Sequence, residues 1–566
     1  MQTAYRQLCF FRSFNGSPEP GTPSNVNPIP SKPFRPHGCF YSIISSNPHR
    51  EIFEAAGRTS ILERRFPMSR SEITRRLFLG GAVGAAGLAS AASNWVELFD
   101  GRSLDGWRAS EHPDTWKLEG GQLVSGGPRS HLFYTDAAHG ADFKNFELEV
   151  EALARPLCNS GVYFHTAYQE SGWPQRGFEV QINNTARGSG GYLERKKTGS
   201  LYGVRDTYKQ FVGDDEWFTL RVAVRGKNVQ VRLNGMLVVD YTEPDPPIHA
   251  AGSPRERFLA HGTFALQGHD PGSQVRVRRV RVRPLPDDTP TPGPAPHPAD
   301  ALDQDILNLA TANVPVVDYH VHLKEGLTLE QALERSRRTG IQYGIAVNCG
   351  KGFPVGDDAG VRRFYERMKG QPTFIAMQAE GREWTQILSR EVAGLFDYIF
   401  TDSMTWTDNH GRRMRLWKPE EVGTIADPRE FMETLVDRAV GIFENEPIDI
   451  YVNPTYLPAV IANNYDRLWT EERMRKVIDA ARRNEIAIEI NNRYKLPSPA
   501  FLKMAKEAGC KFSFGTNNSS AADLGRCEYG IRMAKELKLK WRDFFVPGAW
   551  APKAVVRKPD ALRATA

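Results

Sequence analysis

The chain has 566 residues, of which 40% are hydrophobic and 25% are charged, a composition typical of globular proteins and long enough for two or three domains. The formal net charge of +6 is too small for this length to indicate nucleic acid as a partner. None of the six cysteines form a Cys-x-x-Cys pair, so neither a zinc knuckle nor a disulfide scaffold is indicated.

The amino-terminal part divides into two segments. Residues 1–67 are rich in Pro, Ser, Asn and Arg without a sustained period, and we expect them to be disordered. Residues 68–91 place Arg75-Arg76 before an apolar, Gly/Ala-rich stretch and then small residues, the order typical of a signal peptide and too short for a membrane span. The alternative is a buried Ala/Gly-rich helix.

Thr74–Leu79 resembles a twin-arginine export motif. We therefore expect export to the periplasm or the extracellular space, with no stable membrane span once the signal is cleaved. Because a signal peptide preceded by 67 other residues is unusual, we expect Met68 to be the true start of the protein and residues 1–67 to be an annotation artefact.

From residue 95 to 285 apolar and polar residues alternate with a period of two. Residues 146–151, 218–224 and 229–233 show it clearly. Asn234-Gly235 is typical of a type I′ hairpin turn. Many short strands joined by Gly/Asn turns predict an antiparallel β-sandwich of jelly-roll type.

The last predicted strand, residues 275–283, carries an arginine at nearly every second position. We interpret it as an edge strand whose solvated face holds the arginines, which needs no nucleic-acid partner. The doubled Arg278-Arg279 predicts a bulge that shifts the alternation.

A proline-rich linker, residues 286–300, follows the sandwich. Residues 301–547 then alternate apolar strands with helical segments, and seven such units predict an irregular (β/α)7 TIM-like barrel. Residues 548–566 form a tail. The chain is thus predicted to be multidomain.

Three helix starts in the barrel have strong local signals. Thr328 with Gln331 forms a capping box. Asp427-Pro428 and Ser498-Pro499 each combine an N-cap residue with a proline in the first turn.

Polar residues at the carboxyl ends of barrel strands should converge on one face. His320 and His322 share one side of a strand because side chains alternate, and Glu380 follows a neighbouring strand. This set predicts a site for one divalent ion, Zn²⁺ or Mn²⁺. The alternative is a pair of hydrogen-bonded structural histidines. Other strand-end polar residues are Asn348, Asp402, Asn453, Glu489, Asn491, Thr516, Asn517 and Asn518.

The sandwich has dense polar strand faces of its own. Glu179, Gln181 and Asn183 share one face of a predicted strand, and Gln267 and His269 share a face of another. Burying such groups without a purpose is costly. Amides and carboxylates bind sugar hydroxyls, and aromatic rings such as Tyr163, Trp173 and Tyr202 pack on sugar rings, so the face suits a carbohydrate. The alternative is a solvated outer face.

Several segments of residues 95–285 resemble the 3-keto-disaccharide hydrolase family, which has a concanavalin-like jelly roll. The matching segments are LFDGRSLDGW (98–107), NSGVYF (159–164), GFEVQI (177–182), GSLY (199–202) and LQGH (266–269). The resemblance implies cleavage of glycosides oxidised at carbon 3, by proton removal from carbon 2, elimination and hydration.

On this resemblance, Glu179 and His269 are the candidates for the proton-transfer pair. The candidate substrate-binding residues are Gln181, Gln267, Asn159, His165, Tyr163 and Tyr202. His165 stands where the family often has arginine.

Residues 314–546 resemble the polymerase-and-histidinol-phosphatase (PHP) superfamily of metal-dependent phosphoesterases, through His320-Val321-His322, Glu380 and the segment from Thr516 to Gly525. Asn348, Asn453, Thr516 and Asn518 replace residues that are usually ligands there. Neutral side chains cannot neutralise two or three divalent ions, so at most one is expected, with Asp402 or Glu489 as a further ligand.

Three functions remain open. The first is an exported keto-glycoside hydrolase with an accessory barrel. The second is a carbohydrate-binding sandwich attached to a metal-dependent barrel hydrolase. The third is a binding or scaffold protein in which both sites have eroded. The sequence does not indicate the oligomeric state.

Overall fold

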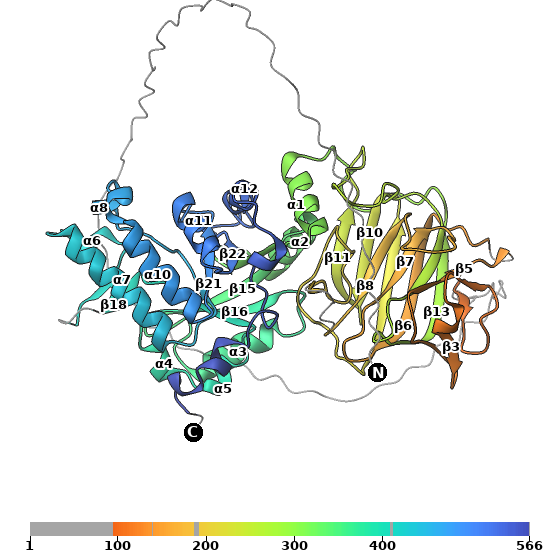
Figure 1. The fold of residues 1–566 in the computed structure, drawn as a ribbon, viewed down its shortest axis with the longest axis horizontal. Helices are drawn as coiled ribbons and strands as arrows, with labels where there is room; N and C mark the ends of the chain where they lie inside the picture. Colours follow the sequence, from red (N-terminus) through yellow and green to blue (C-terminus); the bar gives the residue numbers. More distant parts are fainter. Residues whose placement is uncertain (1–93, 138–139, 186–191, 408–410, 565–566) are drawn as a thin grey trace, which may run out of the picture. The chain divides into compact units, whose positions relative to one another are not determined.

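The computed structural model describes residues 94–137, 140–185, 192–407 and 411–564 (Figure 1). The predicted disordered segment 1–67 and signal peptide 68–91 lie outside these residues. Among the described helices, none is both long and apolar enough to cross a membrane.

The first half is a β-sandwich of two antiparallel sheets. One sheet has the strand order β11-β10-β9-β6-β13-β4-β3, with β1 paired to β13, and the other has the order β2-β5-β12-β7-β8. The strands are β1 (Val96–Phe99), β2 (Trp107–Ala109), β3 (Trp116–Glu119), β4 (Gln122–Ser125), β5 (Ser130–Tyr134), β6 (Asn145–Ala154), β7 (Ser160–Thr166), β8 (Phe178–Ile182), β9 (Trp217–Arg225), β10 (Asn228–Leu233), β11 (Met236–Thr242), β12 (Thr263–Gly268) and β13 (Val275–Leu285).

The alternation in the sequence produces the sandwich core. Leu148 and Val150 of β6, and Val222 and Val224 of β9, are fully buried, because every second side chain of a strand points to the same face. The hairpin between β10 and β11 turns at Asn234-Gly235, where both φ angles are positive (48° and 87°), as a type I′ turn requires. The predicted sandwich is confirmed.

The arginine-rich strand β13 does not lie at an edge. It is flanked by β6 and by β4 and β1, so the edge-strand interpretation is wrong. Its register does shift between Val277 and Arg279, as the predicted bulge requires. The arginines are matched by glutamates on neighbouring strands, in the ion pairs Arg278–Glu151, Arg279–Glu97, Arg281–Glu149 and Arg283–Glu147.

The second half contains a closed barrel of seven strands in the order β14-β15-β16-β17-β20-β21-β22, and its paired strands are parallel. The strands are β14 (Val317–His322), β15 (Gln342–Cys349), β16 (Phe374–Ala379), β17 (Tyr398–Thr401), β20 (Ile450–Tyr451), β21 (Ala487–Asn491) and β22 (Phe512–Gly515). A separate hairpin, β18 (Thr405–Thr407) with β19 (Arg413–Arg415), follows β17.

Helices precede, connect and follow the barrel strands. They are α1 (Ala301–Thr311), α2 (Leu329–Thr339), α3 (Asp358–Met368), α4 (Trp384–Ile387), α5 (Arg390–Ala393), α6 (Pro419–Val422), α7 (Pro428–Asn445), α8 (Ala459–Ala462), α9 (Tyr465–Leu468), α10 (Glu471–Arg483), α11 (Pro499–Glu507), α12 (Glu528–Glu536) and α13 (Ala554–Arg557). Thr328 forms the predicted capping box of α2, and Asp427 and Ser498 cap α7 and α11. Within the predicted tail, Ala554 and Val555 of α13 are buried.

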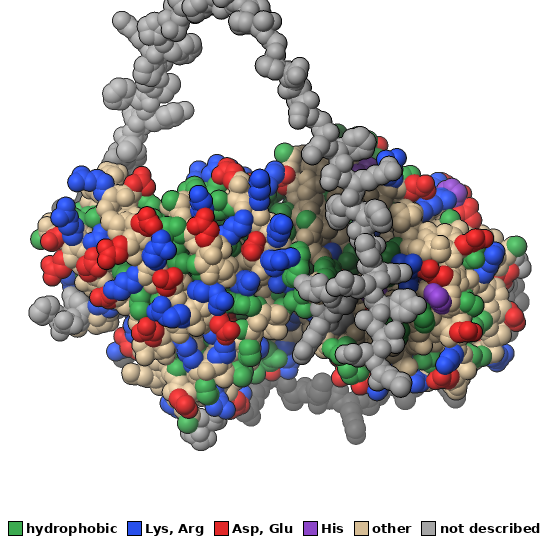
Figure 2. Space-filling model, viewed as in Figure 1, with side chains coloured by type: hydrophobic (Ala, Val, Ile, Leu, Met, Phe, Trp, Pro, Cys, Tyr) green, Lys and Arg blue, Asp and Glu red, His purple; other side chains and the backbone are tan. Residues whose placement is uncertain are grey.

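On the face shown in Figure 2, acidic and basic side chains are interspersed over the barrel helices. Such mixing is typical of a solvated surface.

Candidate functional site

A cavity of about 310 Å³ lies over three neighbouring strands of the smaller sheet, β12, β7 and β8. The sheet order brings distant sequence segments together, since Tyr163 pairs with Glu179 across β7 and β8. Seven of the eight predicted catalytic and substrate-binding residues line it: Asn159, Tyr163, Glu179, Gln181, Tyr202, Gln267 and His269.

Glu179 is the central carboxyl group of this cavity and is only 9% exposed. Its Oε2 accepts a hydrogen bond from the Tyr163 hydroxyl (2.8 Å), and its Oε1 accepts one from Gln267 Nε2 (3.0 Å). Burial raises the pKa of Glu179 to about 7, although the bond from Tyr163 opposes the shift. The carboxyl group can therefore exchange a proton near neutral pH.

Gly161, on the strand beside Glu179, leaves the room that this carboxyl group occupies. A Cβ atom at residue 161 would lie 2.4 Å from Glu179 Oε1. The position of Glu179 thus depends on a residue without a side chain.

His269, the second predicted proton-transfer residue, also lines the cavity. Its Nδ1 lies 2.6 Å from Asp270 Oδ2, and its ring lies 5.1 Å from the ring of Trp173. A carboxylate on Nδ1 fixes the orientation of an imidazole and leaves Nε2 as the reactive nitrogen. Trp173, 39% exposed, adds an aromatic wall to the cavity.

Two predicted residues have contrasting positions. Gln181 faces the cavity, and its amide lies 2.8 Å from Asn159 Oδ1. His165 does not line the cavity: it is buried, with Nε2 at 2.9 Å from Lys144 O and Nδ1 accepting from the Ala260 N–H. These backbone contacts give His165 a structural position rather than a substrate-binding one.

Sequence reasoning missed several cavity residues, chiefly Glu194, Tyr192 and Arg257. Glu194 is 2% exposed, and its Oε2 accepts hydrogen bonds from the hydroxyls of Tyr192 (2.8 Å) and Tyr202 (3.1 Å). Glu194 and Arg257 lie outside the strands, so no periodic pattern marked them. Tyr202, which also lies outside the strands, was predicted because it belongs to a family-like segment.

In the barrel, strand β14 places His320 and His322 side by side, with ring centroids 5.3 Å apart. His320 Nδ1 lies 2.7 Å from Glu489 Oε1. The Nε2 atoms of both histidines are buried without a hydrogen-bond partner among the described residues. Two buried ring nitrogens without partners are unusual and suit a bound group.

The remaining predicted ligands are held by neutral amides. Glu380 Oε1 accepts from Asn348 Nδ2 (2.8 Å), and Asp402 Oδ2 accepts from Asn453 Nδ2 (3.0 Å). Burial, reinforced by the nearby Asp402 carboxylate, raises the pKa of Glu380 to about 8. Among the described residues, no group of three or more His, Cys, Asp or Glu side chains is arranged to hold a metal ion.

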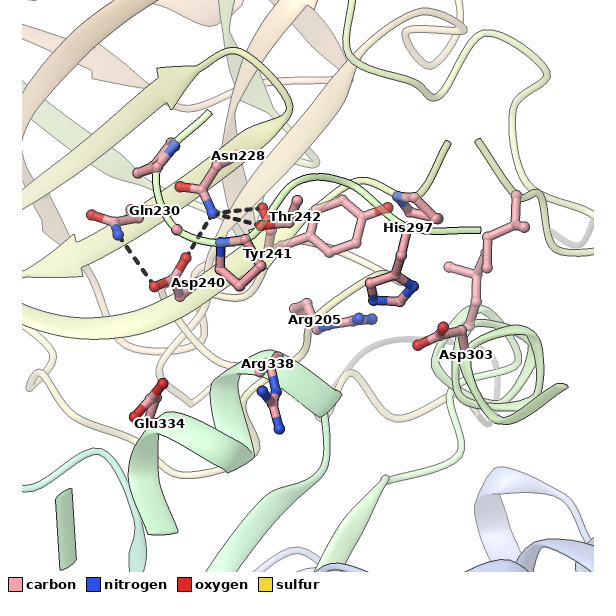
Figure 3. A pocket seen from close by; sticks show the side chains of 16 residues that line it. Arg205, Asn228, Gln230, Asp240, Tyr241, Thr242, His297, Asp303, Glu334 and Arg338 are labelled. Carbon is pink, nitrogen blue, oxygen red and sulfur yellow. Dashed lines mark hydrogen bonds between the residues drawn. The ribbon is translucent and has the colours of Figure 1, made fainter. Parts of the chain in front are cut away.

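A second cavity, of about 290 Å³, is lined by residues that the sequence did not single out (Figure 3). The Arg205 guanidinium lies 4.8 Å from the ring centre of Tyr241. Asn228 Nδ2 donates to Asp240 Oδ1 (2.8 Å) and to Thr242 Oγ1 (3.1 Å). Acidic and basic side chains both line this cavity, so its charge favours no class of ligand.

Comparisons with known proteins concern the sandwich. No curated protein matches the chain. A structure from Parabacteroides distasonis ATCC 8503, described as a "Putative glycosyl hydrolase", is 23% identical and covers 34% of this chain and 99% of its own, with a TM-score of 0.28.

Two further structures match more weakly. The carbohydrate-binding module CBM66 from Bacillus subtilis is 13% identical and covers 31% of this chain and 94% of its own, with a TM-score of 0.21. SCLam, a non-specific endo-β-1,3(4)-glucanase, is 14% identical and covers 34% of this chain and 91% of its own, with a TM-score of 0.22. The family model that matches is that of the 3-keto-alpha-glucoside-1,2-lyase-like domain, over residues 94–283.

Proposed function

We propose that the sandwich is a carbohydrate-active enzyme that cleaves 3-keto-glycosides. The observation that carries the proposal is one cavity holding a buried carboxyl group with a pKa of about 7, Glu179, together with His269 oriented by Asp270. The family match over residues 94–283 supports the substrate class.

His269 acts as the base in this proposal. With Nδ1 held by Asp270, Nε2 carries the lone pair that removes the proton from carbon 2 of the sugar. That proton is acidic because carbon 3 is a ketone, so the electron pair of the C2–H bond moves into an enolate.

Glu179 acts as the acid. At neutral pH much of it is protonated, since its pKa is about 7, and it gives its proton to the glycosidic oxygen as the C1–O bond breaks. The product is a 1,2-unsaturated 3-ketone and a free alcohol. Water then adds to carbon 1 and a proton returns to carbon 2, which makes the net reaction a hydrolysis.

The other side chains of the cavity bind and orient the sugar. The amides of Gln181, Gln267 and Asn159 and the ring of Tyr202 line the cavity, where amides meet hydroxyls and rings cover apolar sugar faces. Trp173 supplies a further platform.

The test is turnover of a 3-keto-α-glucoside by the whole exported chain, compared with the same glucoside unoxidised. We expect cleavage of the keto compound alone, and exchange of its carbon 2 proton with deuterium in D₂O. Cleavage of the unoxidised glucoside at an equal rate, or no cleavage of either, would contradict the proposal.

As a second candidate, the barrel is an irregular (β/α)7, PHP-like domain that holds one divalent ion, attached to a carbohydrate-binding sandwich. The partnerless Nε2 atoms of His320 and His322 favour this site, with Glu380 as third ligand, whereas the lack of a three-ligand arrangement among the described residues counts against it. When bound, the ion would make a water nucleophilic near neutral pH.

The metal proposal is tested by metal analysis and calorimetric titration with Zn²⁺ and Mn²⁺. We expect one ion per chain in the wild type and none after His320→Ala with His322→Ala. An unchanged stoichiometry in the double variant would place the ion elsewhere.

We also propose export through the twin-arginine signal at residues 68–91. The test is amino-terminal sequencing of the mature protein from the periplasm. A mature chain that begins near Met1 would refute both export through this signal and the start at Met68.

A further inference from the structure

The proposed elimination needs a positive group at one defined place. When the carbon 2 proton leaves, negative charge develops on the oxygen of the carbon 3 ketone. Donors or cations already aimed at that oxygen give the largest stabilisation in reactions of this type. His269 and Glu179 handle protons at carbon 2 and at the glycosidic oxygen, so neither is free for this task.

Arg257 is the one Lys or Arg side chain among the described residues that line this cavity. It lies in the connection between β11 and β12 and is half-buried. Its Nη1 donates to Tyr202 O (3.2 Å), which fixes one arm of the guanidinium, while its Nε is buried without a partner. No carboxylate of the described residues forms an ion pair with it.

Most neutral donors of the cavity already have an acceptor within the protein, and the amide N–H groups that remain belong to Asn159, Gln175 and Gln181. The Tyr163 hydroxyl and Gln267 Nε2 donate to Glu179. The Tyr192 and Tyr202 hydroxyls donate to Glu194. Gln175 Nε2 donates to Trp173 O. Among the described residues that line the cavity, Arg257 is therefore the cationic donor with N–H groups to spare for a carbonyl oxygen that becomes negative.

We propose that Arg257 is a further catalytic residue, which binds the carbon 3 oxygen of the sugar and stabilises the enolate. The inference rests on the proposed elimination reaction. The guanidinium gives no proton away: charge moves from the C2–H bond onto the carbon 3 oxygen and returns to form the C1–C2 double bond as the C1–O bond breaks. Arg257 remains a cation throughout, as its chemistry requires.

The proposal implies a substrate preference. The guanidinium fork matches an oxygen that becomes negative only during the reaction, so Arg257 should contribute to turnover more than to binding. A glucoside with a hydroxyl at carbon 3 should bind nearly as well to a protein without Arg257 as to the wild type. Only the glucoside with a ketone at carbon 3 should react.

The test compares three substitutions at residue 257 with one control. R257M and R257Q remove the positive charge, and R257K keeps it on a smaller ammonium group. R255M removes an exposed arginine two residues earlier. Three quantities are measured: kcat on a 3-keto-α-glucoside, the rate of carbon 2 deuterium exchange, and the Kd of the unoxidised glucoside.

We expect R257M and R257Q to lower kcat and the exchange rate by about 10²- to 10³-fold, as for loss of one oxyanion donor, while the Kd of the unoxidised glucoside stays within about threefold. R257K should recover part of both rates, and R255M should match the wild type. If R257M does not fold, R257Q is judged by the same criteria.

Rates within about threefold of wild type in R257Q would overturn the role of Arg257, as would a loss of glucoside binding equal to the loss of rate, which marks uniform binding. The elimination reaction itself is judged separately on the wild type. If the wild type neither exchanges the carbon 2 proton nor cleaves the keto-glucoside, the proposed function fails, whatever residue 257 does.

Discussion

The sandwich cavity and the strand ends of the barrel both hold buried carboxyl groups, but their partners differ. In the sandwich, Glu179 faces a cavity next to a cation, Arg257. In the barrel, Glu380 and Asp402 accept bonds from the amides of Asn348 and Asn453, and the nearby Arg382 guanidinium opposes the rise in the pKa of both carboxyl groups. Burial of a carboxyl group and a nearby cation are thus common to both regions. What distinguishes the sandwich is that Glu179 lines one cavity together with His269 and Arg257, so that a carboxyl group, an imidazole and a guanidinium face the same space.

The largest expected effect comes from Glu179→Gln. The amide keeps the shape of the side chain and can accept only one of the two bonds from Tyr163 and Gln267. Because it cannot give up a proton, kcat on a 3-keto-glucoside should fall by about 10²- to 10⁴-fold. Because His269 remains, carbon 2 deuterium exchange should persist. The barrel control Glu489→Gln should leave kcat unchanged. If it lowers kcat as much as Glu179→Gln, the two regions do not act separately.

The next largest effect is expected from Gly161→Ala. The new methyl group would lie 2.4 Å from Glu179 Oε1 and 2.9 Å from its Cγ, so the carboxyl group must move, and we expect a loss of about 10- to 100-fold in kcat from misplacement of the acid. Gly126→Ala is the matched control, because its nearest neighbour would be 3.7 Å away. Equal activity of the two variants would contradict the constraint on Glu179.

Within the sandwich cavity, the sequence predicted the residues on strands but not those in irregular segments. Glu179, Gln181 and Gln267 were found because they sit on strands, where a period of two fixes the face of each side chain. Glu194 and Arg257 were missed because they lie in irregular segments, where the direction of a side chain depends on contacts that only the fold supplies.

The order of the strands within each sheet could not be predicted from the sequence either. The pattern of residues 275–283 correctly predicted a strand and its bulge, but it could not tell that β13 lies inside a sheet. Charged side chains suit a central strand when its neighbours supply opposite charges in register, as Glu147 and Glu149 of β6 do for Arg283 and Arg281. In the barrel, the His-x-His spacing placed both rings correctly, but the bond from His320 to Glu489 depends on how the barrel closes.

A smaller effect concerns the barrel and its stability. The pKa of Glu380 is raised from its usual 4.5 to about 8, so the folded state binds the proton more tightly than the unfolded state. Its stabilising contribution is complete below about pH 4.5 and is lost as the pH rises to about 8. In the presence of a chelator, Glu380→Gln should therefore be more stable than wild type at pH 8 by about 1–3 kcal/mol, with no difference at pH 4.5.

Denaturant unfolding at both pH values measures this, and the exposed Glu366→Gln serves as control. Added Zn²⁺ also discriminates between the two readings of the barrel. An ion bound by His320, His322 and Glu380 needs the carboxylate, so it should raise the stability of the wild type and reverse the order of the two proteins. An order that Zn²⁺ leaves unchanged would favour structural histidines.

The smallest expected effect tests the acid role of Glu179 through its neighbour. Tyr163→Phe removes the hydroxyl bond to Oε2 (2.8 Å), and this bond lowers the pKa of Glu179. Without this bond, the pKa of Glu179 rises and the acid stays protonated to a higher pH. The basic limb of the pH profile of kcat therefore shifts to higher pH, while the rate at neutral pH changes little. Tyr168→Phe is the control, since Tyr168 packs on the same aromatic cluster and makes no bond to Glu179. If the acidic limb moves instead, Glu179 is the base and the roles assigned to Glu179 and His269 must be exchanged, because the limb that shifts identifies which protonation state of Glu179 the reaction uses.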